Sequence, residues 1–267
     1  MGSFSEEGTH LLPQAVLTKQ RQDCYSINMG QLRVGTSGYA YKEWKGPFYP
    51  PKLPEKKMLE FYSARFSTVE VNYTFYRLPA AKTLEAWIPQ TPPGFTFALK
   101  ATQKITHILR LRNTAELMAA FLQGAQPLVE AGRLGPVLFQ LPPNFKADLP
   151  LLDEFLASLP RALRAAVEFR HASWFTSATY QCLHARNAAL CIAETEEGRP
   201  PLELTADFAY FRLRKVLYPA EELTAWRERF EEWSAAGRDL YVYFKHEDQG
   251  TAPAYANALL EQKSHAR

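Results

Sequence analysis

Residues 165–170, Ala-Ala-Val-Glu-Phe-Arg, alternate apolar side chains with a carboxylate and a guanidinium. A β-strand points successive side chains to opposite faces, so this segment predicts a strand with one apolar face and one face that ends in ionic groups. Several other short apolar runs share this arrangement: Val69–Asn72, Phe97–Lys100, Phe139–Leu141, Phe211–Arg214 and Tyr243–Lys245. Strands that end in this way predict a shared polar pocket at the carboxyl edge of a parallel sheet.

Strand patterns recur along most of the chain. The predicted strands are Leu32–Ser37, Thr68–Asn72, Thr96–Ala101, Pro136–Leu141, Ala165–Arg170, Ala188–Glu194, Phe208–Arg214 and Leu240–His246. Most intervals between them have helical periodicity. The predicted helices are Pro54–Phe66, Ala80–Ile88, Thr114–Ala131, Leu149–Leu159 (with Asp148 as its N-cap), Ser177–Arg186, Ala220–Ala236 and Thr251–Gln262. The segment Glu196–Thr205, with two prolines, predicts an irregular sixth connection.

Alternating strands and helices predict βαβ units and a parallel sheet, and therefore an α/β fold. Eight such units match the size of a single (β/α)8 TIM-like barrel, which we expect over residues 31–267. The alternative is an open doubly wound sheet, although no GxGxxG turn follows the first strand. Residues Met1 to Gly30 predict a poorly ordered N-terminal extension, or alternatively a short docked helix around Leu12–Lys19.

Composition narrows the classes of protein. The net charge of +3 is too small to indicate nucleic-acid binding by itself, and no apolar run is long enough for a membrane span. Three cysteines without CxxC spacing support neither a disulfide framework nor a zinc site, and they favour a reducing, cytoplasmic location. The N-terminal segment has acidic residues and no continuous apolar region, so it is not typical of a signal peptide.

Strand parity separates two surfaces of the predicted barrel. The apolar members of each run are expected to face the helices: Val69, Val71, Phe97, Leu99, Phe139, Leu141, Val167, Phe169, Phe211 and Leu213. The polar members are expected to face the barrel axis near its carboxyl mouth: Glu70, Asn72, Lys100, Gln140, Glu168, Arg170, Arg212, Arg214 and Lys245. An unpaired inward charge is costly, so these groups must pair with one another or meet solvent or a ligand.

Glu70 and Glu168 are the candidate catalytic residues. Their strands are not neighbours in a barrel, so the two carboxylates are expected to face each other and to divide general acid and base roles. The alternative is that each is an ion-pair partner of Lys100 or Arg170.

The surrounding cations predict a small anionic ligand, because guanidinium groups bind carboxylate or phosphate bidentately. The candidate binding residues here are Lys100, Arg170, Arg212, Arg214 and Lys245, with Asn72 and Gln140 to orient hydroxyl groups or water.

Aromatic residues cluster in the loops after the first two strands, and Trp44 and Tyr76 are among them. Such rings, like Trp174 further along, either stack on a ligand or form a rigid cover with its own small core. No HxH or HExxH spacing appears, so we expect neither a protein-bound metal nor another cofactor.

Five segments resemble the markers of the DUF72 family, also called YecE-like proteins: GTSGYAYKEWKGPFYP (35–50), FSTVEVNYTFYRLP (66–79), FTFALKATQKITH (95–107), LGPVLFQLPPNF (134–145) and AVEFRHASW (166–174). The resemblance runs from about Arg33 to Leu260 and implies a TIM barrel of unassigned activity. The marker positions include Trp44, Tyr76, His107 and Trp174, which are therefore counted as candidate binding residues. The chain departs from the family pattern after the seventh and eighth strands, at Arg212–Lys215 and Lys245–Asp248.

The leading hypothesis is an enzyme that acts on a small phosphorylated or carboxylated compound by carboxylate acid/base chemistry. One alternative is a nucleic-acid processing or binding protein, by analogy with other barrels alone. The other is a non-catalytic barrel that binds a ligand or partner. The reaction, metal requirement and oligomeric state stay open at this point.

Overall fold

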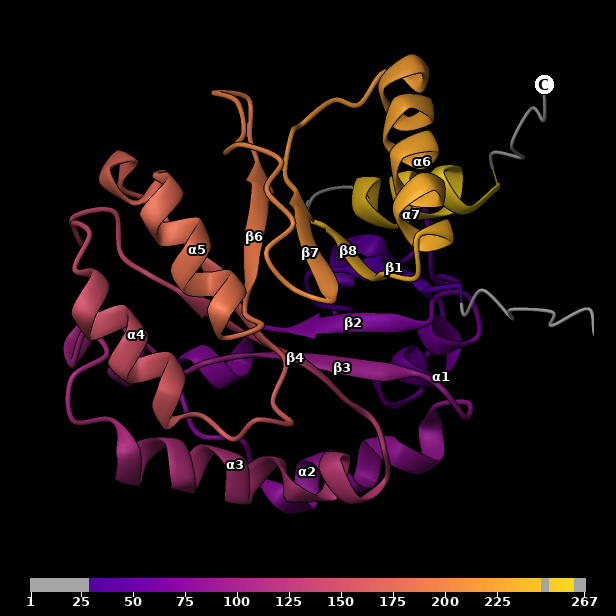
Figure 1. The fold of residues 1–267 in the computed structure, drawn as a ribbon. Coiled ribbons are helices and arrows are strands. Elements are labelled where there is room, and N and C mark those ends of the chain that lie inside the picture. The colour runs from indigo at the N-terminus through magenta and orange to yellow at the C-terminus, as the bar shows by residue number, and fades with distance from the viewer. Residues whose placement is uncertain (1–28, 246–249, 262–267) are drawn as a thin grey trace, which may run out of the picture.

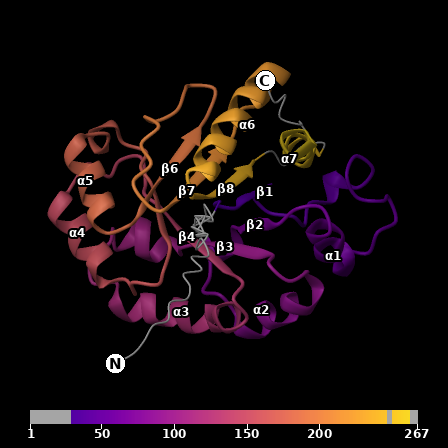
Figure 2. The same ribbon diagram turned by 45° about the vertical axis from the view of Figure 1, so that its right-hand side comes forward.

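The computed structural model describes residues 29–245 and 250–261. Within these ranges, eight parallel strands form one sheet in the order β1-β8-β7-β6-β5-β4-β3-β2. Figure 2 shows the strands in the centre and the helices around them. The strands are β1 Leu32–Thr36, β2 Thr68–Val71, β3 Thr96–Lys100, β4 Leu134–Gln140, β5 Ala165–Glu168, β6 Ala189–Glu194, β7 Phe208–Leu213 and β8 Asp239–Phe244. The predicted TIM-like barrel is therefore confirmed, and it is nearly closed.

The helices follow the strands in alternation, as Figure 1 shows. They are α1 Met58–Ser63, α2 Ala81–Trp87, α3 Ala115–Glu130, α4 Leu149–Ser158, α5 Ser177–Ala185, α6 Ala220–Ala235 and α7 Thr251–Glu261. Short helical turns also occur, at η1 Lys42–Trp44, η2 Glu55–Lys57, η3 Tyr73–Phe75, η4 Ile88–Gln90, η5 Lys104–Ile108 and η6 Ala172–Trp174. The connection from β6 to β7 contains no helix, as its two prolines predicted.

The predicted strands agree with the observed ones to within two residues at each described end. Asp148 caps α4, since its Oδ1 accepts a hydrogen bond from the Leu151 N–H at 3.2 Å. The expected ends at His246 and Gln262 lie outside the described residues, as does most of the predicted extension with its alternative helix at Leu12–Lys19.

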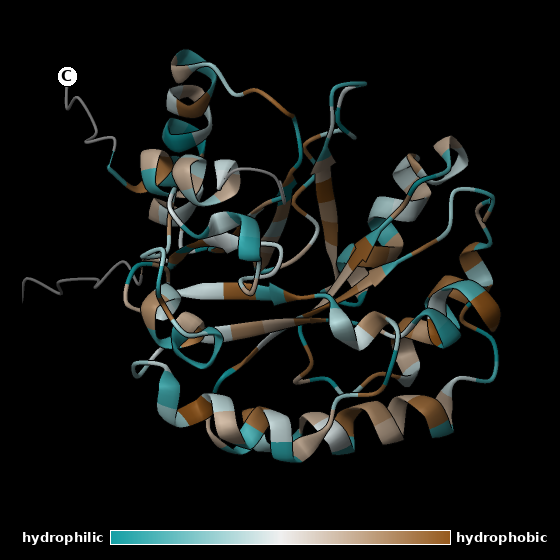
Figure 3. Ribbon diagram, turned by 180° about the vertical axis from the view of Figure 1, so that it is seen from behind, coloured by the Kyte–Doolittle hydropathy of each residue, from teal (hydrophilic) through white to brown (hydrophobic). Residues whose placement is uncertain are grey.

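Strand parity has the predicted effect on packing. The residues expected to face the helices lie in the outer hydrophobic core, together with side chains such as Leu84, Phe121 and Trp226 from the helices. Figure 3 shows central strands that are mostly brown or pale, with some teal segments, and helices that alternate brown and teal. The strands are buried on both faces, as in other parallel sheets covered by helices.

The barrel interior is filled by side chains of very different size. Ala98, Ala166 and Ala189 face inward from one side, and Tyr210 and Tyr243 face inward from β7 and β8. The tyrosine rings fill the space that the alanines leave. Tyr243 Oη lies 2.8 Å from Thr68 Oγ1 of β2, so this side chain links β8 to β2 across the interior.

The join between β1 and β2 is made partly by a side chain. The strands share one backbone bridge, Ser37 to Glu70, and Tyr62 of α1 supplies further bonds. Its hydroxyl accepts from the Thr36 N–H at 2.7 Å and donates to the Thr68 carbonyl at 3.0 Å. A Cβ at Gly35 would lie 2.0 Å from that carbonyl oxygen, so the close approach of the strands requires glycine.

Candidate functional site

A buried cluster of charged and amide side chains lies at the carboxyl mouth of the barrel. Glu70 comes from β2, Lys100 from the end of β3, Gln140 from the end of β4, Glu168 from the end of β5 and Arg212 from β7. In a parallel barrel these positions meet at one rim, because all strands run in the same direction. The structure therefore brings together side chains that are up to 142 residues apart in sequence.

Arg212 lies between the two carboxylates. Its Nη2 is 2.9 Å from Glu70 Oε1, and its Nη1 is 2.6 Å from Glu168 Oε2. The three residues are at most 2% exposed. The guanidinium is the shared ion-pair partner of two buried carboxylates, so its removal would take this partner from both of them.

Glu70 has two hydroxyl donors besides Arg212. Tyr210 Oη donates to Glu70 Oε2 at 2.7 Å, and Ser37 Oγ donates to Oε1. Asn72 Nδ2 donates in turn to Ser37 Oγ at 3.2 Å, which ties this amide to the cluster. Burial alone would raise the pKa of Glu70, but the charge of Arg212 and the two hydroxyl donors outweigh it and lower the pKa below its ordinary value.

Glu168 Oε1 is surrounded by donors. Gln140 Nε2 donates to it at 2.8 Å and Arg170 Nε at 3.1 Å, while Arg214 Nη1 lies 3.9 Å away. Burial alone would raise the pKa of this carboxyl, but Arg212, Arg170 and the Gln140 bond lower it to about 2. Both carboxylates are therefore ionised at neutral pH.

Lys100 has a different environment from the other cations. Its Nζ donates to Gln140 Oε1 at 2.9 Å and lies 4.0 Å from the centre of the Phe75 ring. Burial, together with the charge of Arg212, lowers its pKa to about 8 against the partly compensating charges of Glu70 and Glu168.

His107 contacts the same Phe75 ring as Lys100. Its ring packs edge-on against Phe75 at 5.0 Å between centroids, and its Nδ1 is 2.8 Å from Thr106 Oγ1. Burial and the charge of Lys100 lower its pKa, so the imidazole is mostly neutral at pH 7.

The other four predicted binding residues differ from one another in position and exposure. Lys245 follows β8, where its backbone N–H donates to the Leu213 carbonyl at 3.0 Å. Trp44 and Trp174 are fully buried, so neither offers a ring face to a ligand, and the structure does not bring them to the cluster. Trp44 packs among aromatic rings, and Trp174 stacks on Phe169 at 4.5 Å. Tyr76 is 74% exposed and contacts the Phe75 ring at 5.2 Å.

Two residues of the cluster were missing from the sequence-based candidates, Ser37 and Tyr210. Both have the inward parity of their strands: Ser37 lies two residues after Gly35, and Tyr210 lies two residues before Arg212. Parity is a signal for both residues, and Ser37 also lies in the family segment at 35–50. A hydroxyl group stands out less in a strand than a charge does, so parity alone does not single these residues out.

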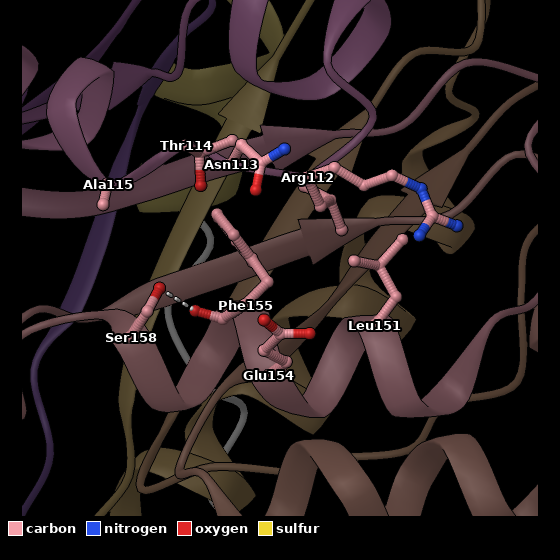
Figure 4. Close-up of a pocket in the computed structure, with 9 residues that line it drawn as sticks. Arg112, Asn113, Thr114, Ala115, Leu151, Glu154, Phe155 and Ser158 are labelled. Carbon is pink, nitrogen blue, oxygen red and sulfur yellow. Dashed lines mark hydrogen bonds between the residues drawn. The ribbon is translucent and has the colours of Figure 1, made fainter.

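Several cavities lie near the loops of the barrel. One of about 260 Å³ adjoins the cluster and is lined by Glu70, Asn72 and aromatic side chains including Tyr39, Tyr73 and Trp87. Another of about 340 Å³ lies between the segment before α3 and helix α4 (Figure 4), and no member of the charged cluster lines it. The first cavity therefore gives the mouth an aromatic wall next to Glu70.

Residues 29–245 and 250–261 contain neither a cluster of metal-ligand side chains nor a membrane-spanning helix. No group of three or more His, Cys, Asp or Glu side chains there is placed to hold a metal ion. None of the helices in these ranges combines the length and apolar character needed to cross a bilayer.

Comparisons with known proteins agree on one family. The family described as "Protein of unknown function DUF72" matches residues 33–267. The UPF0759 protein YunF of Bacillus subtilis is 29% identical over 271 residues, which cover 86% of this chain and 94% of YunF. The UPF0759 protein YecE of Escherichia coli is 39% identical over 118 residues, 44% of this chain and 43% of YecE.

Solved structures agree with this result. The crystal structure of a DUF72 family protein from Thermotoga maritima has a TM-score of 0.77 and 30% identity, and it covers 86% of this chain and 98% of that one. A DUF72 family protein from Enterococcus faecalis, at 18% identity, has a TM-score of 0.75 and covers 86% of this chain and 94% of its own, which supports the fold alone.

Proposed function

This chain belongs to the DUF72 family, and we propose that it is an enzyme that binds a small phosphorylated or carboxylated compound at the carboxyl mouth of its barrel. Arg170 and Arg214 hold the anionic group in this proposal, with Lys100 beside them. Glu70 and Glu168 take part as acid/base residues.

The observation that carries the proposal is the excess of cations around Glu168. Within residues 29–245 and 250–261, the cluster combines the cations Lys100, Arg170, Arg212 and Arg214 with the carboxylates Glu70 and Glu168, so these six side chains have a net charge of +2. Arg212 alone already bonds both carboxylates. The other cations therefore favour a further negative charge, and an anionic ligand supplies it.

The two outer guanidinium groups have donors available. In the part of the chain that the structure describes, Arg170 donates through Nε alone, and its side chain is 34% exposed. Arg214 lies too far from Glu168 for a hydrogen bond, at 3.9 Å, and its side chain is 23% exposed. The terminal nitrogens of each guanidinium form a planar fork that can bind the oxygens of phosphate or carboxylate.

Ligand binding is also expected to change the acidity of Glu168. A carboxyl with a pKa of about 2 holds no proton at pH 7 and is a weak base. An anion between Arg170 and Arg214 would offset the positive charges that lower this pKa, and it would add a negative charge beside the carboxylate. The pKa of Glu168 should then rise toward its ordinary value, so that proton transfer becomes effective only with substrate bound.

Thermal unfolding with inorganic phosphate tests the binding step. Phosphate should raise the Tm of the wild-type protein, with NaCl added to the control to match ionic strength; binding at a hundredfold the Kd contributes about 2.7 kcal/mol. The double variant Arg170→Ala/Arg214→Ala should lose most of this rise. Arg161→Ala, an exposed residue in the loop before β5, is the matched control. An equal rise in Tm in all three proteins would rule out anion binding by Arg170 and Arg214.

One observation favours a second candidate, a non-catalytic ligand-binding barrel: both carboxylates are paired with Arg212. A screen of phosphorylated and carboxylated metabolites separates the two functions, with binding followed by thermal shift and conversion by NMR. A ligand that binds and is converted supports the enzyme, and Glu168→Gln should then abolish conversion. A ligand that binds and stays unchanged supports the second candidate.

A further inference from the structure

Among the residues that the structure describes, Lys100 has no carboxylate partner, although two carboxylates lie in the same cluster. In the described ranges, no Asp or Glu oxygen forms an ion pair with its Nζ, whereas Lys57 and Lys215 each pair with a glutamate. The amide of Gln140 separates the amine from Glu168, since its Oε1 accepts from Lys100 at 2.9 Å and its Nε2 donates to Glu168 at 2.8 Å.

The amine is also largely removed from solvent, with Nζ over the face of an aromatic ring. Nζ is 4.0 Å from the centre of the Phe75 ring, and Lys100 is only 9% exposed. A lysine that is desolvated and close to other cations is activated as a nucleophile, because both effects favour the neutral amine. These conditions lower the pKa of Lys100 to about 8, so about a tenth of the amine is unprotonated at pH 7.

We infer that Lys100 is a nucleophile that forms an imine with the carbonyl group of a small anionic oxo compound, such as an oxo acid. This inference rests on the proposed function, because Arg170 and Arg214 hold the carboxylate or phosphate of that compound. It also narrows the substrate class to anions that contain an aldehyde or ketone group.

The step balances without any further reagent. The Nζ lone pair attacks the carbonyl carbon, and an N–C bond forms while the carbonyl oxygen takes up a proton. The carbinolamine then loses its hydroxyl group as water, with both hydrogens of that water derived from the neutral amine. The product is a C=N bond between Lys100 and the substrate, and no oxidant or reductant is consumed.

Reductive trapping tests the inference on the full wild-type chain. The protein is incubated with glyoxylate or pyruvate and sodium borohydride, which transfers hydride to the imine carbon and leaves a stable secondary amine. Peptide mass spectrometry then compares Lys100 with Lys82 and Lys146, two exposed lysines of the same chain. We expect Lys100 to be labelled at least tenfold faster than Lys82 and Lys146. Phosphate should slow the labelling of Lys100 and leave the labelling of the two exposed lysines unchanged.

The pH dependence gives a second readout. Labelling of Lys100 should increase with pH up to about 8 and then level off, as the amine loses its proton. The charged and titratable groups that act on this amine are Arg212, Glu70, Glu168, Arg170 and His107.

Variants separate this inference from the proposed function. Lys100→Arg keeps the charge and cannot form an imine, so it should lose trapping and keep part of the stabilisation by phosphate. Lys104→Arg, an exposed neighbour in η5, is the matched control and should behave as wild type. If Lys100 is labelled no faster than Lys82 and Lys146 while phosphate still stabilises the protein, the inference that Lys100 is a nucleophile is wrong. The proposed anion-binding site would then still be supported. If phosphate has no effect either, the proposed function is wrong as well.

Discussion

Replacement of Glu168 by glutamine tests the electrostatic organisation of the barrel mouth. The amide keeps the shape of the side chain and removes its charge. Glu168 accepts from Arg212 at 2.6 Å, from Gln140 at 2.8 Å and from Arg170 at 3.1 Å. In the variant, the amide NH₂ group would face at least one of these donors, and Arg212 would keep a single carboxylate partner.

The expected magnitude follows from two independent arguments. Removal of one partner from a buried ion pair costs about 3–5 kcal/mol. A fall in the pKa of Glu168 from 4.5 to about 2 corresponds to about 3 kcal/mol, since each tenfold change in proton affinity is worth about 1.4 kcal/mol. We therefore expect Glu168→Gln to lower the free energy of unfolding by about 3 kcal/mol at pH 7.

The effect should depend on pH in a defined direction. The pKa of Glu168 is lowered on folding, so its stabilisation is fully present above about pH 4.5 and is lost as the pH falls toward 2. Glutamine does not titrate. The difference between wild type and variant should therefore be constant from pH 7 to about pH 5 and should shrink below it.

Urea unfolding followed by circular dichroism at pH 7, 5 and 3.5 measures this difference. Glu228→Gln, an exposed position on α6, is the control and should have almost no effect. A loss below about 1 kcal/mol at pH 7 would refute the reasoning, because breaking a buried ion pair costs more than that. A difference that grows on acidification would also refute it.

Two further predictions concern the fold. Tyr62→Phe removes the hydroxyl that joins Thr36 to Thr68, and it should cost about 1–3 kcal/mol in urea unfolding, because a buried N–H and a carbonyl lose their partner. Tyr76→Phe, at an exposed ring, should change nothing, and an equal loss in both variants would contradict the role of Tyr62. Asp148→Ala removes the cap of α4 and should cost about 1 kcal/mol in the same assay, whereas Asp148→Asn should restore most of it. If asparagine is as damaging as alanine, the charge of Asp148 matters more than its cap.

Local sequence patterns were sufficient to predict the eight strands and the seven α-helices of the described residues, although α1 is shorter than the predicted Pro54–Phe66 and the short turn η5 was not predicted. In a strand, parity is a property of neighbouring residues, so Val167, Glu168 and Phe169 already reveal which side chain faces the axis. The apolar runs, the turns between them and the cap at Asp148 act within a few residues in the same way. Parity also placed Glu70, Lys100, Gln140, Glu168 and Arg212 at one rim.

The partners within that rim depended on the tertiary structure. Sequence analysis offered Lys100 or Arg170 as the partner of each carboxylate. Arg170 does pair with Glu168, but Arg212 bonds both carboxylates, and Lys100 bonds an amide and a ring. Pairing of this kind is set by the relative heights of strands and by the distances across the barrel, which no local pattern encodes. Likewise, the burial of Trp44 and Trp174 and the Tyr62 link between β1 and β2 are consequences of how helices and loops close over the sheet. The sequence by itself thus determined that the charged side chains of the cluster reach the mouth, and only the tertiary structure decided which hydroxyl groups join them, which charges neutralise one another and that Lys100 bonds an amide there.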